Sequence, residues 1–397
     1  MYFNRAIEPI LLAALQQFPV CILTGARQVG KSTLLKNHLK NYTYVTLDEP
    51  LVREVANNDP KLFLSRYKSP LIIDEIQYAP GLLPYIKIIV DENRQSYGQY
   101  VLTGSQSFSL MQGVSETLAG RAAIFELYPP SFNEIVSWPN ALNIYDVNQV
   151  VKQIITGFYP ELLTVPTIDH KTWYASYLAT YIERDIRQLI KIVDLNRFQT
   201  FISLLASRAG QLFNISEIAK ECGVSSPTIK SWLSALEASY IIYLVKPYYK
   251  NISKRLVKSP KLYFIDSGLL CYLLGIDSEE RFFNSSEKGH IFENMIVIDY
   301  IKQLKQQQLR FEVYFYRDSS GLEVDLLIEK QGLLNGFEIK FSSTLHQKMA
   351  NGLAKIKKEL NLNYSAILSL ETRNIPLLEG IDTIHWSKAL DLAFIKN

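Results

Sequence analysis

The sequence predicts an α/β protein of several domains, and three observations support this. Over the first 135 residues, short apolar segments of strand type alternate with segments of helical periodicity, which is typical of a parallel sheet. The first apolar segment runs into a loop bounded by Gly25 and Gly30 and followed by Lys31 and Ser32. At 397 residues the chain is also too long for one core of ordinary size, so two to four domains are expected.

The loop after the first strand is suited to hold nucleotide phosphates. Its two glycines let backbone N–H groups approach phosphate oxygens, Lys31 can reach the β and γ phosphates, and the Ser32 hydroxyl can bind Mg²⁺. The helix that follows adds its positive dipole end. The predicted ATP-binding residues are the loop, the start of this helix and an acid from a later strand: Gly25, Ala26, Arg27, Gln28, Val29, Gly30, Lys31, Ser32, Thr33 and Asp74.

The apolar strand at 70–73 ends in two carboxylates, Asp74 and Glu75. Because the carboxyl ends of parallel strands meet at one edge of a sheet, we expect both acids beside the phosphate loop. Asp74 then suits the Mg²⁺ shell, together with Ser32. Glu75 suits a general base that polarises the attacking water.

Two further positions are candidates for contacts with the γ phosphate. Thr103 or Ser105 ends the next apolar strand and could hydrogen-bond the attacking water, although a turn hydroxyl is an equally good interpretation. Arg121 precedes the strand at 122–127 and is a candidate to stabilise charge on the nucleotide of a neighbouring subunit, the alternative being a solvated arginine. A role in a neighbouring site would require a homo-oligomer.

Four segments of this region resemble those of one known family: LTGARQVGKS at 23–32, DEIQYAP at 74–80, LTGS at 102–105 and LAGR at 118–121. They look like the prokaryotic AAA+ ATPases that carry a C-terminal domain of unknown function, and later segments extend the match to most of the chain. The resemblance implies a five-stranded parallel sheet, ATP binding by residues 25–33, Mg²⁺ support by Asp74 and hydrolysis support by Glu75. A second sensor arginine is not evident, although residues 183–187 offer candidates.

The middle of the chain contains a pattern typical of a winged helix-turn-helix. A short helix from Ser216, a turn at 222–224 and a second helix from Ser226 are followed by two strand-like segments, at 241–245 and 261–265. DNA binding would depend on Ser225, Thr228, Lys230 and Ser231 facing outward, and on the basic residues between and beside the two strands, Lys250, Lys254, Arg255, Lys258 and Lys261, with Tyr248 and Tyr249 among them. Winged helices also serve as protein-packing modules, so both interpretations stay open.

Two predicted strands near the C-terminus carry acids and a lysine. Alternation places Glu323 and Asp325 on one face of the first strand, and Glu338 and Lys340 on one face of the second. Asp325 and Glu338 are candidate ligands of Mg²⁺ or Mn²⁺, Glu293 from a preceding helix is a further one, and Lys340 could orient or activate water.

This arrangement resembles the PD-(D/E)XK nuclease superfamily, with Val324 in the place of the proline. The attached domain of the ATPase family named above is similar to that fold. The other interpretation is a relic of a nuclease that binds without cleaving.

Composition sets wider bounds. A net charge of +3 neither requires nor excludes a nucleic-acid partner. No apolar run approaches the roughly 20 residues of a membrane span, and the first residues show no signal-peptide pattern. The three separated cysteines fit buried thiols in a reducing compartment, so a cytoplasmic protein is expected.

The sequence therefore predicts four domains: an AAA+ P-loop parallel-sheet core at 1–135, a helical lid or connector at 136–205, a winged helix-turn-helix at 206–266 and a restriction-endonuclease-like α/β domain at 267–397. The expected function is ATP binding and hydrolysis coupled to modules that act on nucleic acid. The alternative is a nucleotide-controlled protein-interaction switch whose nuclease-like domain is catalytically silent.

Overall fold

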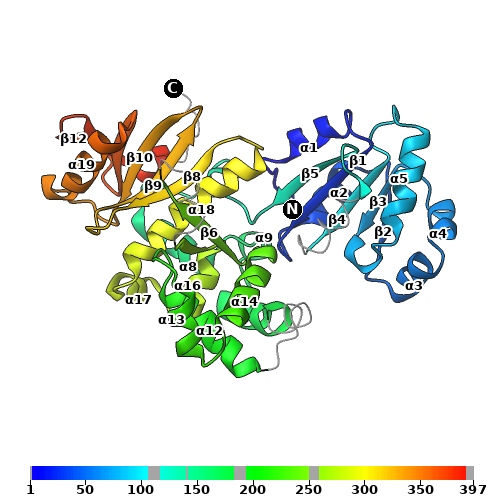
Figure 1. Ribbon diagram of the computed structural model, residues 1–397, viewed down its shortest axis with the longest axis horizontal. Helices are drawn as coiled ribbons and strands as arrows, with labels where there is room; N and C mark the ends of the chain where they lie inside the picture. The colour runs from blue at the N-terminus through cyan, green and yellow to red at the C-terminus, as the bar shows by residue number, and fades with distance from the viewer. Residues whose placement is uncertain (1, 106–116, 140–141, 183–193, 250–258, 390–397) are drawn as a thin grey trace. The chain divides into compact units, whose positions relative to one another are not determined.

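The structure is a computed structural model of the chain and describes residues 2–105, 117–139, 142–182, 194–249 and 259–389 (Figure 1). The chain divides into two compact units. The first contains residues 1–129 with the short segments 238–240 and 305–308, and the second contains the rest. The division falls at Pro129, in the proline-containing segment that follows the last strand of the first unit.

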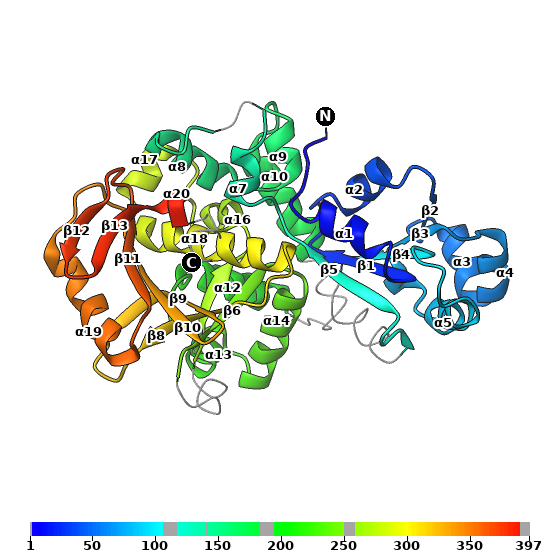
Figure 2. The ribbon, with the colours of Figure 1, turned by 90° about the horizontal axis from the view of Figure 1, so that it is seen from above.

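The first unit is built on a five-stranded sheet with the strand order β2-β3-β4-β1-β5 (Figure 2). Every neighbouring pair is parallel, which confirms the predicted parallel sheet. Residue pairs such as Leu23 with Thr103 set the register. The strands are β1 (Val20–Gly25), β2 (Thr43–Thr46), β3 (Leu71–Asp74), β4 (Tyr100–Gly104) and β5 (Ala122–Leu127).

Helices connect these strands as the alternating pattern predicts. α5 buries Leu82, Leu83, Ile86 and Val90, whose helical spacing forms one apolar face. That face packs with apolar residues of α3, α4 and the sheet in one core. The helices of the described first unit are α1 (Glu8–Ala14), α2 (Lys31–His38), α3 (Pro50–Asn58), α4 (Pro60–Arg66) and α5 (Leu82–Glu92), with a 3₁₀ turn at Ile76–Tyr78.

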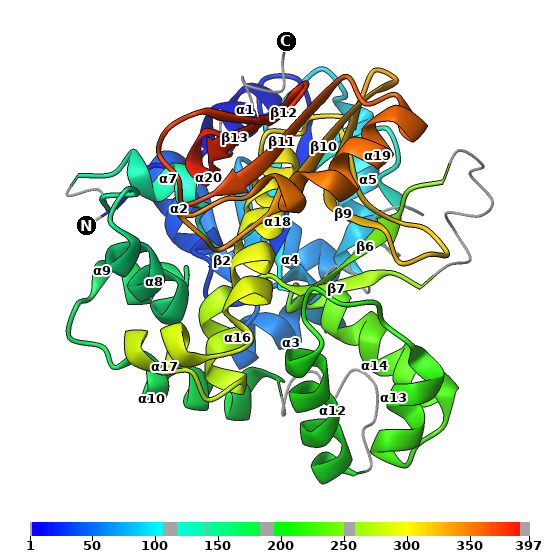
Figure 3. The same ribbon diagram turned by 90° about the vertical axis from the view of Figure 1, so that its left-hand side faces the viewer.

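The second unit contains an eight-stranded mixed sheet with the order β12-β13-β11-β10-β9-β8-β6-β7 (Figure 3). Its centre is the antiparallel hairpin of β9 and β10, and β10 also pairs with β11 in parallel. The strands are β6 (Ile242–Pro247), β7 (Lys261–Phe264), β8 (Glu312–Arg317), β9 (Glu323–Lys330), β10 (Leu333–Ile339), β11 (Tyr364–Ser369), β12 (Ile375–Leu378) and β13 (Ile381–His385).

The two strands predicted for a wing, β6 and β7, do pair as an antiparallel hairpin. However, β6 also pairs in parallel with β8, and the backbone N–H of Tyr248 donates to the carbonyl of Phe315 at 2.7 Å. The hairpin is therefore an extension of the C-terminal sheet and not a free-standing wing. One sheet crosses the predicted domain boundary at residue 266.

Two helices before this hairpin follow the predicted helix-turn-helix spacing. The Asn214 side chain caps α13 (Ile215–Cys222) by accepting from the N–H of Ser216 at 3.0 Å, and Gly223 ends the helix at φ 64°. On α14, Ile229 and Trp232 are buried while Lys230 is exposed, as amphipathic spacing requires. The winged-helix assignment itself stays a prediction.

The remaining described helices of the second unit are α7 (Phe132–Val136), α8 (Val147–Thr156), α9 (Pro160–Thr164), α10 (His170–Tyr177), α12 (Leu195–Ser207), α13 (Ile215–Cys222), α14 (Ser226–Ala238), α16 (Ser267–Leu273), α17 (Glu279–Asn284), α18 (Lys288–Gln306), α19 (Asn351–Leu360) and α20 (Trp386–Ala389). α10 continues as a π-helical segment, Leu178–Ile182, within the region predicted as a helical lid or connector. Residues 183–187, the candidates for a second sensor, lie outside the described residues, as do the basic residues at 250, 254, 255 and 258. No helix in the described part of the chain is long and apolar enough to cross a membrane.

Candidate functional site

The phosphate loop connects β1 to α2, as the sequence predicts. Gly25 has φ 149°, and a Cβ built on it would lie 2.1 Å from the carbonyl oxygen of Leu127 on the neighbouring strand. Gly30 has φ 90° and immediately precedes the first turn of α2. A larger residue would therefore clash with Leu127 at position 25, and at position 30 it would be forced into a backbone conformation that favours glycine.

Lys31 is the first residue of α2 and is 6% exposed. Its Nζ donates to the carbonyl oxygens of Gly25 and Ala26, both at 2.9 Å, so the ammonium lies inside the loop. Burial lowers the pKa of Lys31 to about 8, although Glu75 and Asp74 act in the opposite direction. An ammonium held in this position can interact with phosphate oxygens bound by the same loop.

Asp74, at the end of β3, accepts hydrogen bonds from three hydroxyl groups. Ser32 Oγ donates to Asp74 Oδ2 at 2.8 Å, Tyr44 donates to the same oxygen, and Thr103 donates to Oδ1. Burial and the bond to Asp74 raise the pKa of the Tyr44 phenol. The predicted neighbours Ser32, Asp74 and Thr103 are therefore together. Tyr44 was not predicted, because nothing in the sequence shows that β2 lies beside β3.

Glu75 follows Asp74 in a left-handed backbone conformation, with φ 58°. Its backbone N–H donates to Thr103 Oγ1 at 3.3 Å. Its carboxylate accepts from the Gln77 amide and from Ser105, whose Oγ is 3.3 Å away. Both hydroxyls at the end of β4 thus contact the acid pair, Thr103 through Asp74 and Ser105 through Glu75. Gln77 was missed because it lies in the turn that follows.

Arg121 lies at the opposite end of the sheet strands from the loop. β5 pairs with β1 so that Ala122 is beside Val20, and the phosphate loop follows the other end of β1. Six residues of strand span roughly 20 Å. The guanidinium forms a bidentate pair with Asp91 of α5, at 2.7 and 2.9 Å. Arg121 is therefore far from the phosphate loop of its own unit. A role in ATP hydrolysis would require Arg121 to reach the nucleotide of a neighbouring subunit.

Comparison with known proteins identifies the domains that carry these residues. Residues 17–136 match the family described as "AAA domain", and residues 147–280 and 288–389 match "Domain of unknown function (DUF8612)" and "Domain of unknown function (DUF4143)". Uncharacterized protein Rv2008c of Mycobacterium tuberculosis is 30% identical over 375 residues, which are 94% of this chain and 81% of that protein. Uncharacterized protein Mb2031c of Mycobacterium bovis matches equally. The chain belongs to the Rv2008c family.

Two solved structures are also similar to this Rv2008c-family chain. The Walker-type ATPase paby2304 of Pyrococcus abyssi is 16% identical, with 69% of this chain and 96% of that chain covered at a TM-score of 0.47. AMPPCP-bound DnaA of Aquifex aeolicus is 12% identical, with 59% and 89% covered at a TM-score of 0.31. The AAA-domain match, and not these structures, shows that this family member contains a P-loop nucleotide-binding domain of the AAA type.

The second unit of the Rv2008c-family protein contains a cluster of charged side chains on β7, α18, β9 and β10, here called the ionic cluster. Its members are Lys261, Glu293, Glu323, Asp325, Glu338 and Lys340, with Arg317 bonded to it. The structure therefore brings together Glu293, Asp325, Glu338 and Lys340, which the sequence singled out. Among the described residues, no group of three or more His, Cys, Asp or Glu side chains is arranged to hold a metal ion.

Lys261 was expected to contact DNA from beside the wing strands, but it is buried. Lys261 is 2% exposed, and its Nζ lies 2.9 Å from Glu293 Oε1 and 3.7 Å from Asp325 Oδ1. It also pairs with Glu323. As the first residue of β7 it faces the cluster, because β7 is an edge strand of the same sheet that carries the acids.

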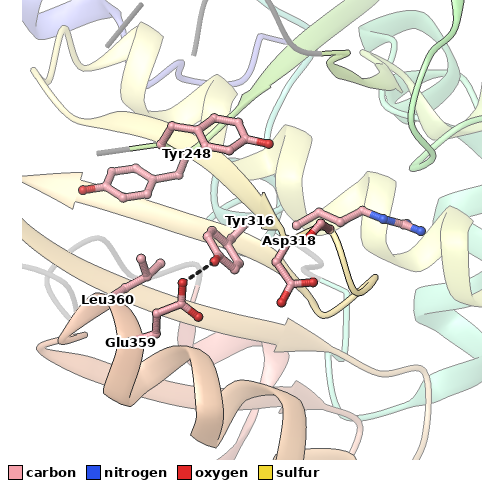
Figure 4. Close-up of a pocket in the computed structure, with 8 residues that line it drawn as sticks. Tyr248, Tyr316, Asp318, Glu359 and Leu360 are labelled. Atoms are coloured by element: carbon pink, nitrogen blue, oxygen red, sulfur yellow. Dashed lines mark hydrogen bonds between the residues drawn. The ribbon is translucent and has the colours of Figure 1, made fainter. Parts of the chain in front are cut away.

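A pocket of about 400 Å³ lies near β8 and α19 in the same unit (Figure 4). Tyr248, Tyr316 and Glu359 line it, and Figure 4 shows the Tyr316 hydroxyl directed at Glu359, to which it donates at 2.7 Å. Tyr248 was expected at a nucleic-acid surface, but it is 8% exposed and packs edge-on against Tyr314. Aromatic walls suit a planar ligand, and the charged groups of the lining are the carboxylates of Glu359 and Asp318 and the guanidinium of Arg317.

Proposed function

We propose that this protein binds and hydrolyses ATP, and that its nucleotide state controls the second unit, which acts on nucleic acid. The observation that carries the ATPase proposal is the convergence of Lys31, Ser32, Asp74, Glu75 and Thr103 at one edge of the parallel sheet. Positioned charges of this kind are what phosphoryl transfer requires of a protein.

The residues present fit a nucleotide with Mg²⁺. The Ser32 hydroxyl and the Asp74 carboxylate, 2.8 Å apart, are hard oxygen donors of the kind that Mg²⁺ prefers. Bound Mg²⁺ would neutralise charge on the phosphates. Residues 25–33 would hold the phosphates through backbone N–H groups and Lys31. Tyr44 and Thr103 fix the orientation of Asp74.

Glu75 would accept a proton from the attacking water or orient it. Its carboxylate is held by Gln77 and Ser105, so it does not need to be ordered when the nucleotide binds. Thr103 is proposed to act by positioning Asp74 and the backbone of Glu75.

Phosphate release tests the ATPase proposal. The wild type should hydrolyse ATP in the presence of Mg²⁺, whereas Lys31→Ala should lose ATP binding and turnover together. Lys40→Ala, which changes an exposed lysine just after the same helix, is the matched control. Hydrolysis by Lys31→Ala at the rate of the control would remove the phosphate-loop assignment.

The nucleic-acid part of the proposal is supported by α14, where Lys230 and Ser231 are exposed beside the exposed turn residue Ser225. Such a helix face is suited to phosphate contacts, whose affinity falls as salt is raised. Lys230→Ala should weaken binding to duplex DNA and reduce its salt dependence. Lys61→Ala, an exposed lysine of the first unit, should leave binding unchanged.

The alternative is a nucleotide-controlled interaction protein whose second unit cleaves nothing, and the contacts of Lys261 favour it. Nicking of supercoiled DNA with Mg²⁺ or Mn²⁺, with and without ATP, separates the two. Cleavage that Lys340→Ala loses would support a nuclease. Protein that hydrolyses ATP but cleaves under no condition would support the interaction protein.

A further inference from the structure

The ionic cluster holds a side-chain cation among its acids. The ammonium of Lys261 bonds to Glu293 at 2.9 Å and to Glu323, and lies 3.7 Å from Asp325. Glu293 and Asp325 are two of the three acids that the sequence proposes as ligands of a divalent metal. An ammonium in contact with these oxygens repels a metal ion that would need the same oxygens at roughly 2.1 Å.

Lys261 is not a surface lysine that could readily swing away. It is 2% exposed, and burying an unpaired ammonium costs several kcal/mol. Removal of Lys261 would leave the buried carboxyl groups of Glu293 and Asp325 without this partner.

The cluster contains further side-chain cations that pair with its acids. Its four carboxyl groups face Lys261, Lys340 and Arg317, which bond to Glu293, Glu338 and Glu323 respectively. Lys261 and Lys340 therefore already pair with Glu293 and Glu338, two of the three acids that a metal ion would need.

We propose that the Lys261 ammonium is the resident cation of this cluster, in the place that a divalent metal would take in a metal-dependent nuclease. Lys261 then stabilises the packing of α18 against the sheet, and the second unit acts without a bound metal. This proposal does not depend on ATP hydrolysis by the first unit.

Mn²⁺ binding to full-length, nucleotide-free protein tests the proposal. All samples carry Asp74→Asn, so that the oxygen donors of the phosphate loop do not contribute. Unbound Mn²⁺ is measured by electron paramagnetic resonance. The parent protein should bind no Mn²⁺ at concentrations up to about 100 µM. Lys261→Met keeps a side chain of similar length but removes the charge. This variant should gain a site whose Mn²⁺ affinity is at least tenfold higher than that of the parent protein, as expected for loss of a local positive charge.

Two further variants identify the site. Adding Asp325→Asn to Lys261→Met should abolish the gained site, whereas adding Glu280→Gln, at an exposed acid of α17, should leave it. Lys261→Arg, which keeps a cation, should bind no Mn²⁺. Tight Mn²⁺ binding by the parent protein that Asp325→Asn abolishes would overturn the proposal. This measurement tests the proposal even if Lys261→Met does not fold. A folded Lys261→Met protein that gains no site would also overturn it.

Discussion

Ser32 Oγ donates a hydrogen bond to Asp74 Oδ2 at 2.8 Å and so joins the first turn of α2 to the end of β3. These residues lie far apart in the sequence, and the parallel sheet brings them together. The bond matters because the proposed Mg²⁺ site would use this hydroxyl and this carboxylate as two of its oxygen donors.

Asp74→Asn should therefore uncouple nucleotide affinity from Mg²⁺. We expect Mg²⁺ to tighten ATP binding by the wild type at least tenfold and to leave Asp74→Asn unchanged within about twofold. Titration of a fluorescent ATP analogue with and without Mg²⁺ measures this, and Asp48→Asn, an exposed acid after β2, is the control. An unchanged Mg²⁺ response in Asp74→Asn would contradict the assignment.

ATP affinity should also depend on pH through Lys31. Its pKa in the free protein is about 8, because burial opposes the charged form. Bound phosphates favour the ammonium and raise this pKa, so binding takes up a proton once the pH exceeds about 8. Affinity should be level below that pH and fall by up to tenfold per unit above it. Competition binding between pH 7.5 and 9.5 tests this. Lys31→Arg should show no fall, and a level wild-type profile would refute the prediction.

Gly25→Ala should destabilise the first unit. A Cβ would meet the Leu127 carbonyl at 2.1 Å, and φ 149° is strained for alanine. We expect the free energy of unfolding to fall by about 1–3 kcal/mol in urea titrations. Gly81→Ala is the matched control, because a Cβ there meets nothing within 4 Å. Equal stability of the two variants would show that β1 and β5 are not this close.

Arg121 should act across a subunit interface, because it and the phosphate loop of its own unit lie at opposite ends of the strands. Arg121→Ala should then retain ATP binding and lose turnover. Mixing it with Glu75→Gln should restore part of the activity, since some mixed interfaces combine an intact Glu75 with an intact Arg121. A wild-type monomer with full activity, or no recovery on mixing two assembled variants, would exclude this role.

The sequence was sufficient for the phosphate loop and the acid pair, because each is contiguous and follows a strand. It also placed Thr103 correctly, since the end of a parallel strand must lie at the same sheet edge. It could not place Tyr44 or Gln77, whose contacts with Asp74 and Glu75 depend on strand order and on the conformation of one turn.

Lys261 shows the limit in the second unit. At the start of a short strand and close to several basic residues, it looked like a surface residue. Its partners Glu293 and Glu323 come from a helix and a strand much later in the chain. Only the attachment of β6 to β8, which joins the hairpin to the C-terminal sheet, explains why this lysine is buried among acids.

The most direct test of the ATPase proposal is to measure ATP binding and ATP turnover in the same preparation of Glu75→Gln. Our account predicts ATP affinity within about threefold of the wild type and turnover reduced at least a hundredfold, the usual contribution of a general base. Glu49→Gln, at an exposed acid before α3, should match the wild type in both. Wild-type turnover in Glu75→Gln would contradict the assignment of Glu75 as the catalytic base.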